Sequence, residues 1–326
     1  MTQREKIGAY AAWLAVCFFW GTTYLAIRIG LETMPPMLFA GLRFLAAGTI
    51  LLCFASRFQR GVWLPRGREW FDLGLVGLML LGIGTGVVVW AEQWVPSGLA
   101  ALLVATSPFW VALLEKLRPQ GERTGKRAIL GMVIGFGGLV LLVAPDLLQT
   151  DLQGPYLFGL IALQIGCASW SGGSIYAKQH PTAVSPLVGA SIQMLFAGVA
   201  LTLVGTLLGE WPRVHFNARS FGAFLYLMVF GSIVAYGSYL YALQKLPLSL
   251  VSTYSYINPV IAVLLGWLLL AEPLGWRVVI GASVILAGVA LVKTNPKKIL
   301  ADRAARREEK EMIHHTSPQV CRVGAD

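Results

Sequence analysis

Residues 17–48 read CFFWGTTYLAIRIGLETMPPMLFAGLRFLAAG, and residues 167–198 read CASWSGGSIYAKQHPTAVSPLVGASIQMLFAG. At an offset of 150 positions these stretches share several identities: Cys17 with Cys167, Trp20 with Trp170, Pro36 with Pro186, and Ala47-Gly48 with Ala197-Gly198. The repeat continues at an offset of 151, where Pro108 matches Pro259. Each half consists mostly of apolar segments long enough to cross a bilayer. A membrane protein built from two such halves is typically a transporter whose site lies where the repeats meet.

The composition excludes a soluble fold. The chain has 326 residues, of which 56% are hydrophobic and only 13% charged, as expected for a protein embedded in lipid. The four cysteines show no CxxC spacing, so neither a disulfide framework nor a metal site is indicated. The net charge of +10 does not indicate nucleic acid as a partner, because the basic residues cluster in particular loops and in the tail.

Ten apolar segments have the length of about 20 residues that a bilayer requires. They lie at about 8–28, 36–56, 70–91, 97–116, 126–145, 155–177, 186–208, 219–243, 248–270 and 275–293. The sequence therefore predicts an all-α polytopic membrane protein with ten transmembrane helices. They form one five-helix repeat in residues 1–146 and a second in residues 154–293, followed by a charged tail, residues 294–326.

The basic loops predict the orientation of these spans. Four arginines lie in 57–68 and five Lys or Arg residues in 116–127, whereas the connections 92–97 and 146–154 have none. By the positive-inside rule, both termini lie in the cytoplasm. Because five spans per half is an odd number, the two repeats are expected to be inverted. The tail is either a solvated charged segment or a weak contact for anionic headgroups.

Charged residues inside the predicted spans require an explanation, because a central Arg costs about 2.5–3.5 kcal/mol on insertion scales. Arg43 lies near the middle of the second span, and its repeat mate is Gln193. Arg43 is either an anchor for an anionic substrate group or a structural residue that binds carbonyls or a Glu of a neighbouring helix. Glu92 and Glu115 lie near span ends, where they face headgroups or act as coupling carboxylates.

Aromatic and hydroxyl residues recur inside the spans. They are expected either to line a substrate cavity or to pack in the core: Trp20, Thr23, Trp110, Trp170, Ser174, Tyr236, Tyr239 and Tyr256. Ser107-Pro108 and Asn258-Pro259 occupy matched positions in the two halves. Since proline weakens a helix one turn earlier, these pairs are either hinges or gates, or plain kinks.

The chain resembles the drug/metabolite transporter superfamily, specifically its ten-span EamA-type exporters. The resemblance rests on FFWGTTYLAIRIG and PPMLFAGLRFLAAGTILL in the first half, and on ALQKLPLSLVSTYSYINPVIAVLLGWLLLAEPLGWRVVIGASVILAGVALV in the second. It implies two inverted five-helix repeats around a central cavity, and export of amino acids or other small metabolites. Relatives in this superfamily carry nucleotide sugars or sugar phosphates.

We therefore expect a secondary transporter of the bacterial inner membrane that exports an amino acid or a similar amphipathic solute by alternating access. The alternatives are a sugar-phosphate or nucleotide-type exchanger, or a channel. An enzyme is not expected, since no HExxH or GxSxG motif is present and no His falls within a span. The expected partners are a small-molecule substrate and the lipid bilayer, with no cofactor and no metal. The oligomeric state stays open.

Overall fold

The computed structural model describes residues 3–58, 64–118, 154–246, 254–271 and 274–293, together with Val251 and single positions within 129–141. All regular structure in these residues is helical. The described elements of the first part of the chain are α1 (Gln3–Gly30), α2 (Pro36–Phe58), α3 (Arg68–Gly77), η1 (Leu78–Thr85), α4 (Gly86–Ala91), α5 (Ser97–Val104) and α6 (Ser107–Leu117).

The second part repeats this order. Its elements are α8 (Pro155–Gln179), α9 (Pro186–Leu207), the short 3-10 helix η2 (Trp211–Arg213), α10 (Ala218–Tyr226), η3 (Leu227–Tyr236), α11 (Gly237–Lys245), α13 (Tyr254–Leu270) and α14 (Trp276–Lys293). Pro36, Pro155 and Pro186 each start a helix, where the missing N–H of proline carries no penalty.

Seven helices are long and apolar enough to cross a membrane, and two shorter apolar helices, Ile257–Leu270 and Trp276–Gly288, follow them in the described part of the chain. The all-helical class predicted from the sequence is confirmed for these residues. The predicted span at 126–145 lies largely outside the described residues, so the count of ten stays a prediction.

The third span of each repeat contains a π-helical segment. η1 covers residues 78–85 and η3 covers residues 227–236, an offset of about 150. Each π segment continues an α-helix at both ends, so Arg68–Ala91 and Ala218–Lys245 are continuous helical spans. π segments within α-helices occur frequently at functional sites.

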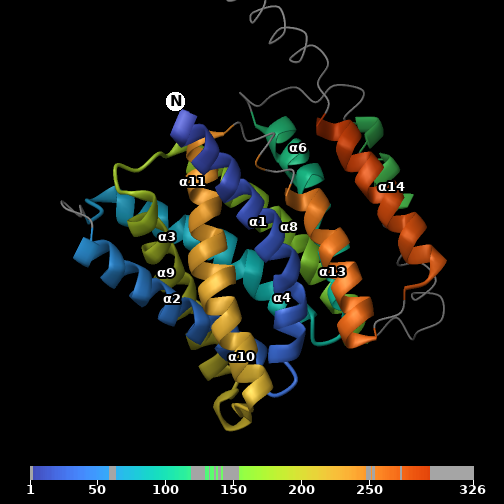
Figure 1. Cartoon of the computed structure of the whole chain (residues 1–326), viewed down its shortest axis with the longest axis horizontal. Helices are drawn as coiled ribbons and strands as arrows, with labels where there is room; N and C mark the ends of the chain where they lie inside the picture. The colour runs from blue at the N-terminus through green and yellow to red at the C-terminus, as the bar shows by residue number, and fades with distance from the viewer. Residues whose placement is uncertain are drawn as a thin grey trace, which may run out of the picture.

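Helices α2 and α9 pack closely against each other, and glycine permits this approach. A Cβ added at Gly48 would lie 3.0 Å from Leu195 Cγ, and one added at Gly198 would lie 2.7 Å from the backbone N of Leu45. Gly198 is the repeat mate of Gly48, and Leu45 is the repeat mate of Leu195, so the second contact is the first one with the two repeats exchanged. The repeat in the sequence is therefore a repeat in the packing. In Figure 1, α13 and α14 lie on the side of the molecule opposite α2 and α3.

Gly198→Ala is expected to lower the stability of the purified protein by on the order of 1 kcal/mol. The new methyl group would overlap backbone rather than the flexible end of a side chain, and overpacking of this kind destabilises cores. Thermal unfolding measures the effect. Gly222→Ala in α10 is the matched control, because a Cβ there meets nothing within 4 Å. Equal unfolding temperatures for the two variants would contradict the close α2–α9 contact.

Candidate functional site

A cavity of about 110 Å³ lies between helices of both repeats. One water molecule needs about 10–15 Å³ on such a scale, so the space holds several waters or one small solute. Seven residues singled out in the sequence line it: Trp20, Thr23, Arg43, Ser107, Trp170, Tyr236 and Asn258. Among the lining residues, Arg43 alone carries a charge at neutral pH. The rest of the lining is aromatic, aliphatic, hydroxyl-bearing or small.

The repeat mates Trp20 and Trp170 meet edge to face in the lining, with ring centroids 5.5 Å apart. The Trp20 ring also lies 5.1 Å from the ring of Tyr239 and 5.0 Å from that of Tyr254. We call Trp20, Trp170, Tyr239 and Tyr254 the aromatic cluster. Because its members come from α1, α8, α11 and α13, the aromatic cluster lies where the two repeats meet.

A hydrogen bond ties the aromatic cluster to the π segment of the second repeat. The indole Nε1 of Trp20 donates to the backbone carbonyl of Gly231 at 3.2 Å, and Gly231 belongs to η3. Gly231 and Ser232 of the same segment line the cavity, as do Gly84 and Thr85, the last two residues of η1. Both π segments therefore contribute to the cavity wall.

Arg43 is buried, with 3% of its surface exposed. Its guanidinium carbon lies 4.4 Å from the centroid of the Phe44 ring. The Nε atom is buried and has no hydrogen-bond partner among the described residues. Glu92 is fully buried just after the end of α4. Its carboxylate attracts the positive charge of Arg43.

The repeat mate of Arg43 has a partner of its own. Gln193 is 5% exposed, and its side-chain carbonyl accepts a hydrogen bond from the hydroxyl of Tyr236. Gln193 and Tyr239 do not line the cavity but lie behind lining residues.

Other residues singled out in the sequence lie elsewhere. The indole of Trp110 donates to Gln164 Oε1 at 3.0 Å, fastening α6 to α8. The Ser174 hydroxyl donates to the carbonyl of Trp170 at 2.8 Å. Glu115 forms a half-buried ion pair with Arg118 at 2.8 Å. The side chain of Tyr256 lies outside what the structure describes.

Glu92 does not face the surface of the protein. Its side chain is fully buried, and its backbone carbonyl accepts a hydrogen bond from the guanidinium of Arg28. A position facing headgroups therefore does not fit Glu92, in contrast to the partly exposed Glu115.

The two matched prolines differ in local structure. Pro259 lies inside α13, whereas Pro108 lies in the first turn of α6, just after the break between α5 and α6. Ser107 donates to the carbonyl of Val104 at 2.6 Å, which satisfies one of the carbonyls freed by this break. When the side-chain amide of Asn258 is turned so that its nitrogen faces the neighbouring carbonyls, it donates to those of Cys17 and Tyr254 at 2.9 and 3.0 Å.

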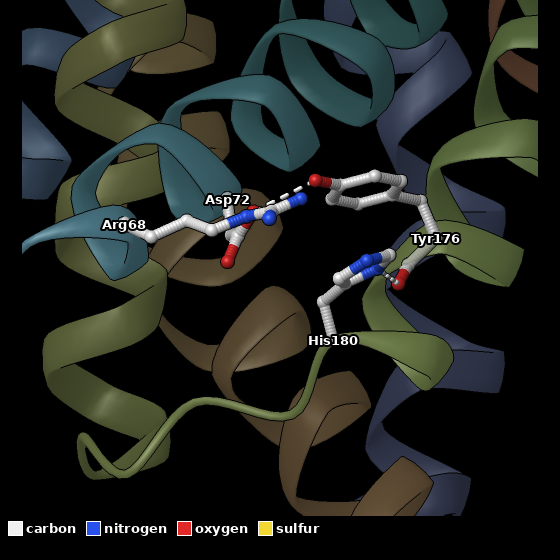
Figure 2. Close-up of polar contacts among 4 residues, drawn as sticks. All are labelled: Arg68, Asp72, Tyr176 and His180. Carbon is white, nitrogen blue, oxygen red and sulfur yellow. Dashed lines mark hydrogen bonds and ion pairs between the residues drawn. The ribbon is translucent and has the colours of Figure 1, made fainter.

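A second polar group, which was not predicted from the sequence, joins α3 to α8 (Figure 2). The Tyr176 hydroxyl donates to Asp72 Oδ1 at 2.7 Å, and Arg68 Nε lies 3.6 Å from the same oxygen. The His180 ring stacks on Tyr176 with centroids 4.1 Å apart. We call these four residues the α3–α8 cluster. Its signal in the sequence was an aspartate inside a predicted span, which by default indicates a functional or structural site.

The cavity also has lining residues that were not predicted from the sequence: Tyr24, Phe44, Thr85, Cys167 and Tyr254. Tyr24 lies one turn after Trp20 on the same face of α1, so helical spacing alone could have found it. Phe44 and Cys167 resemble ordinary apolar residues of a membrane span, and only their positions in the packed structure reveal them.

Long apolar helices that enclose a cavity between two sequence repeats define a membrane transporter. The model of the EamA-like transporter family matches residues 7–144 and again residues 157–294. The chain belongs to this family, a branch of the drug/metabolite transporters, and the duplication predicted from the sequence is confirmed. The exact limits of the repeats, 1–146 and 154–293, and the separate tail 294–326, stay predictions.

Similar proteins occur in bacteria and plants. The "Uncharacterized inner membrane transporter YedA" of Escherichia coli strain K12 is 39% identical over 293 residues, which cover 90% of this chain and 92% of that protein. The "WAT1-related protein At3g02690, chloroplastic" of Arabidopsis thaliana is 27% identical, covering 87% of this chain and 70% of that protein. One crystal structure superposes with a TM-score of 0.66 at 21% identity over 91% of this chain and 98% of the other, which shows a shared fold alone.

Proposed function

We propose that this transporter exports a small amphipathic metabolite, such as an amino acid, from the bacterial cytoplasm by alternating access. The observation that carries the proposal is the cavity between the repeats, lined by aromatic and hydroxyl groups around a single charge. Pockets for small molecules are mostly apolar with a few placed polar groups. The relative named as an inner membrane transporter supports assignment to that membrane.

Alternating access in repeat transporters proceeds by rocking one repeat against the other around a fixed site. The meeting of Trp20 with its mate Trp170 at the cavity fits such a site on the axis between the repeats. Contacts that repeat at the 150-residue offset between α2 and α9 fit two halves related by a twofold axis. We infer that five spans per repeat make this relation an inversion.

The substrate is tested by counterflow into liposomes that contain the purified protein. Separate panels of amino acids, sugars, sugar phosphates and nucleotides are offered as counter-substrates. Uptake that is stimulated by amino acids or similar amphipathic solutes supports the proposal. Stimulation by sugar phosphates or nucleotides alone would favour the exchanger instead, and conversion of a solute would identify an enzyme.

The proposed orientation predicts the side from which engineered cysteines react. In a variant without native cysteines, Arg66→Cys is expected to react with an impermeant maleimide only from the cytoplasmic side. Arg213→Cys is expected to react only from outside, because it precedes the eighth predicted span at its outer end. Both positions are exposed. Labelling of intact cells and of inside-out vesicles distinguishes the sides, and the reverse pattern at both positions would overturn the orientation.

A further inference from the structure

The cavity contains one charged side chain whose donor is not satisfied. Arg43 lines the cavity, and its Nε has no hydrogen-bond partner among the described residues although the side chain is only 3% exposed. A buried polar group without a hydrogen-bond partner destabilises the folded protein, and more so when it is charged. A solute that accepts a hydrogen bond from Arg43 would offset this cost.

In the second repeat, the residue that matches Arg43 has a hydrogen-bond partner supplied by the protein. Gln193, the mate of Arg43, is bound by the hydroxyl of Tyr236. The two π segments end at Thr85 and Tyr236, and each is followed by a glycine, so Thr85 is the residue that matches Tyr236. The Thr85 hydroxyl donates to the carbonyl of Leu80 at 3.3 Å. Arg43 Nε therefore lacks the kind of protein partner that Tyr236 supplies to Gln193.

The charges around Arg43 favour a single negative charge on the solute. Two basic residues lie near Glu92: its carboxylate attracts Arg43, and Arg28 donates a hydrogen bond to its backbone carbonyl. Two guanidinium groups and one carboxylate leave one positive charge when all three are ionised. Glu92 itself does not line the cavity, so the group that faces a solute is Arg43.

We propose that Arg43 binds a monoanionic group of the transported solute, a carboxylate or a group of similar size, while the body of the solute lies against Trp20, Trp170 and Tyr254. The inference rests on the proposed function and narrows its substrate class. A planar guanidinium forms two parallel hydrogen bonds to a carboxylate, and aromatic rings accept an apolar or cationic body. A phosphate dianion would require a second cation, and the described lining offers none.

The test compares acids with their amides, because this change removes the anion and keeps the shape. The probes are phenylalanine with phenylalaninamide, leucine with leucinamide, and 3-phenylpropionate with 3-phenylpropionamide. Binding to the purified protein is measured by tryptophan fluorescence and by thermal stabilisation. In the wild type, at least one acid is expected to bind about tenfold or more tightly than its amide, the scale of one lost charge-assisted hydrogen bond.

Variants of Arg43 test whether the preference for the acid over the amide depends on this side chain. Arg43→Gln is expected to bind the acid about tenfold or more weakly and to lose the preference over the amide. Arg43→Lys is expected to fall between Arg43→Gln and the wild type, because an ammonium keeps the charge but not the planar fork. Arg57→Gln is the matched control, since it removes the same charge from an exposed position on the same helix and should bind as the wild type does.

The proposal would be overturned by amides that bind the wild type as tightly as the acids, by undiminished acid binding by Arg43→Gln, or by a wild type that binds none of these acids. If Arg43→Gln does not fold, the comparison of acid with amide in the wild type still decides. If acid binding depends on Arg43 but no counterflow is observed, the proposed function is contradicted and the anion site still stands. Counterflow that is indifferent to Arg43 would contradict the anion site and leave the function.

Discussion

Trp20→Ala is expected to reduce counterflow by about tenfold or more while leaving folded protein in the membrane. The indole of Trp20 contacts Trp170, Tyr239 and Tyr254, and it donates to the Gly231 carbonyl. Each aromatic pair contributes about 0.5–1.5 kcal/mol beyond buried area. The substitution removes three such pairs from the wall of the proposed site, so both the shape of the cavity and the contact between the repeats change.

The matched control is Trp267→Ala, the same substitution at a residue of α13 that is 51% exposed. It should leave counterflow close to that of the wild type. Tyr239→Ala, within the same aromatic cluster, is expected to impair transport or to alter substrate preference as Trp20→Ala does. If Trp20→Ala and Tyr239→Ala only lower the yield of folded protein, and the folded fraction transports normally, the aromatic cluster is packing and the site lies elsewhere.

Asp72→Ala is expected to destabilise the protein by about 1.5–3 kcal/mol, the range for hydrogen bonds to charged groups. Asp72 is 8% exposed and accepts from Tyr176 at 2.7 Å. The bond joins the third span of the first repeat to the first span of the second, so its loss weakens an interface between the repeats. Thermal unfolding of the purified variant measures the loss.

A double-mutant comparison isolates this bond from other effects. Tyr176→Phe should cost about as much as Asp72→Ala, and the two together should cost clearly less than their sum. Glu115→Ala is the control, because its ion pair with Arg118 is partly exposed and such pairs contribute about 0.2–1 kcal/mol. Fully additive losses at Asp72 and Tyr176 would show that the two side chains act independently.

The class of the protein and the duplication were predictable because both depend on the order of residues along the chain. Apolar segments of spanning length predict helices, and the described helices agree with nine of the ten predicted spans to within a few residues, apart from the start of the first. The start of the ninth predicted span lies largely outside the described residues. The sequence marked the repeat mates Trp20 and Trp170 as residues that either line a cavity or pack in the core, and the structure places both in the cavity lining. Their rings lie 5.5 Å apart in the structure.

The details of the site depend on packing, which the sequence encodes only indirectly. Pro108 and Pro259 occupy matched positions, yet one begins a helix and the other lies within one. The π segments could not be predicted, since no residue pattern requires them. Asp72 was visible as a carboxylate in a span, but its partner Tyr176 lies 104 positions away. The unsatisfied donor of Arg43 is likewise a property of the packed structure.

We propose that the cavity between the repeats belongs to a carrier. Counterflow into liposomes that hold the purified protein, with current measured in the same preparation, distinguishes a carrier from a channel. A carrier is expected to show uptake that saturates with external substrate, increases with substrate loaded inside, and is weakened by Trp20→Ala but not by Trp267→Ala. Flux that rises linearly with concentration, accompanied by an ohmic current and unaffected by internal substrate, would identify a channel and contradict this account.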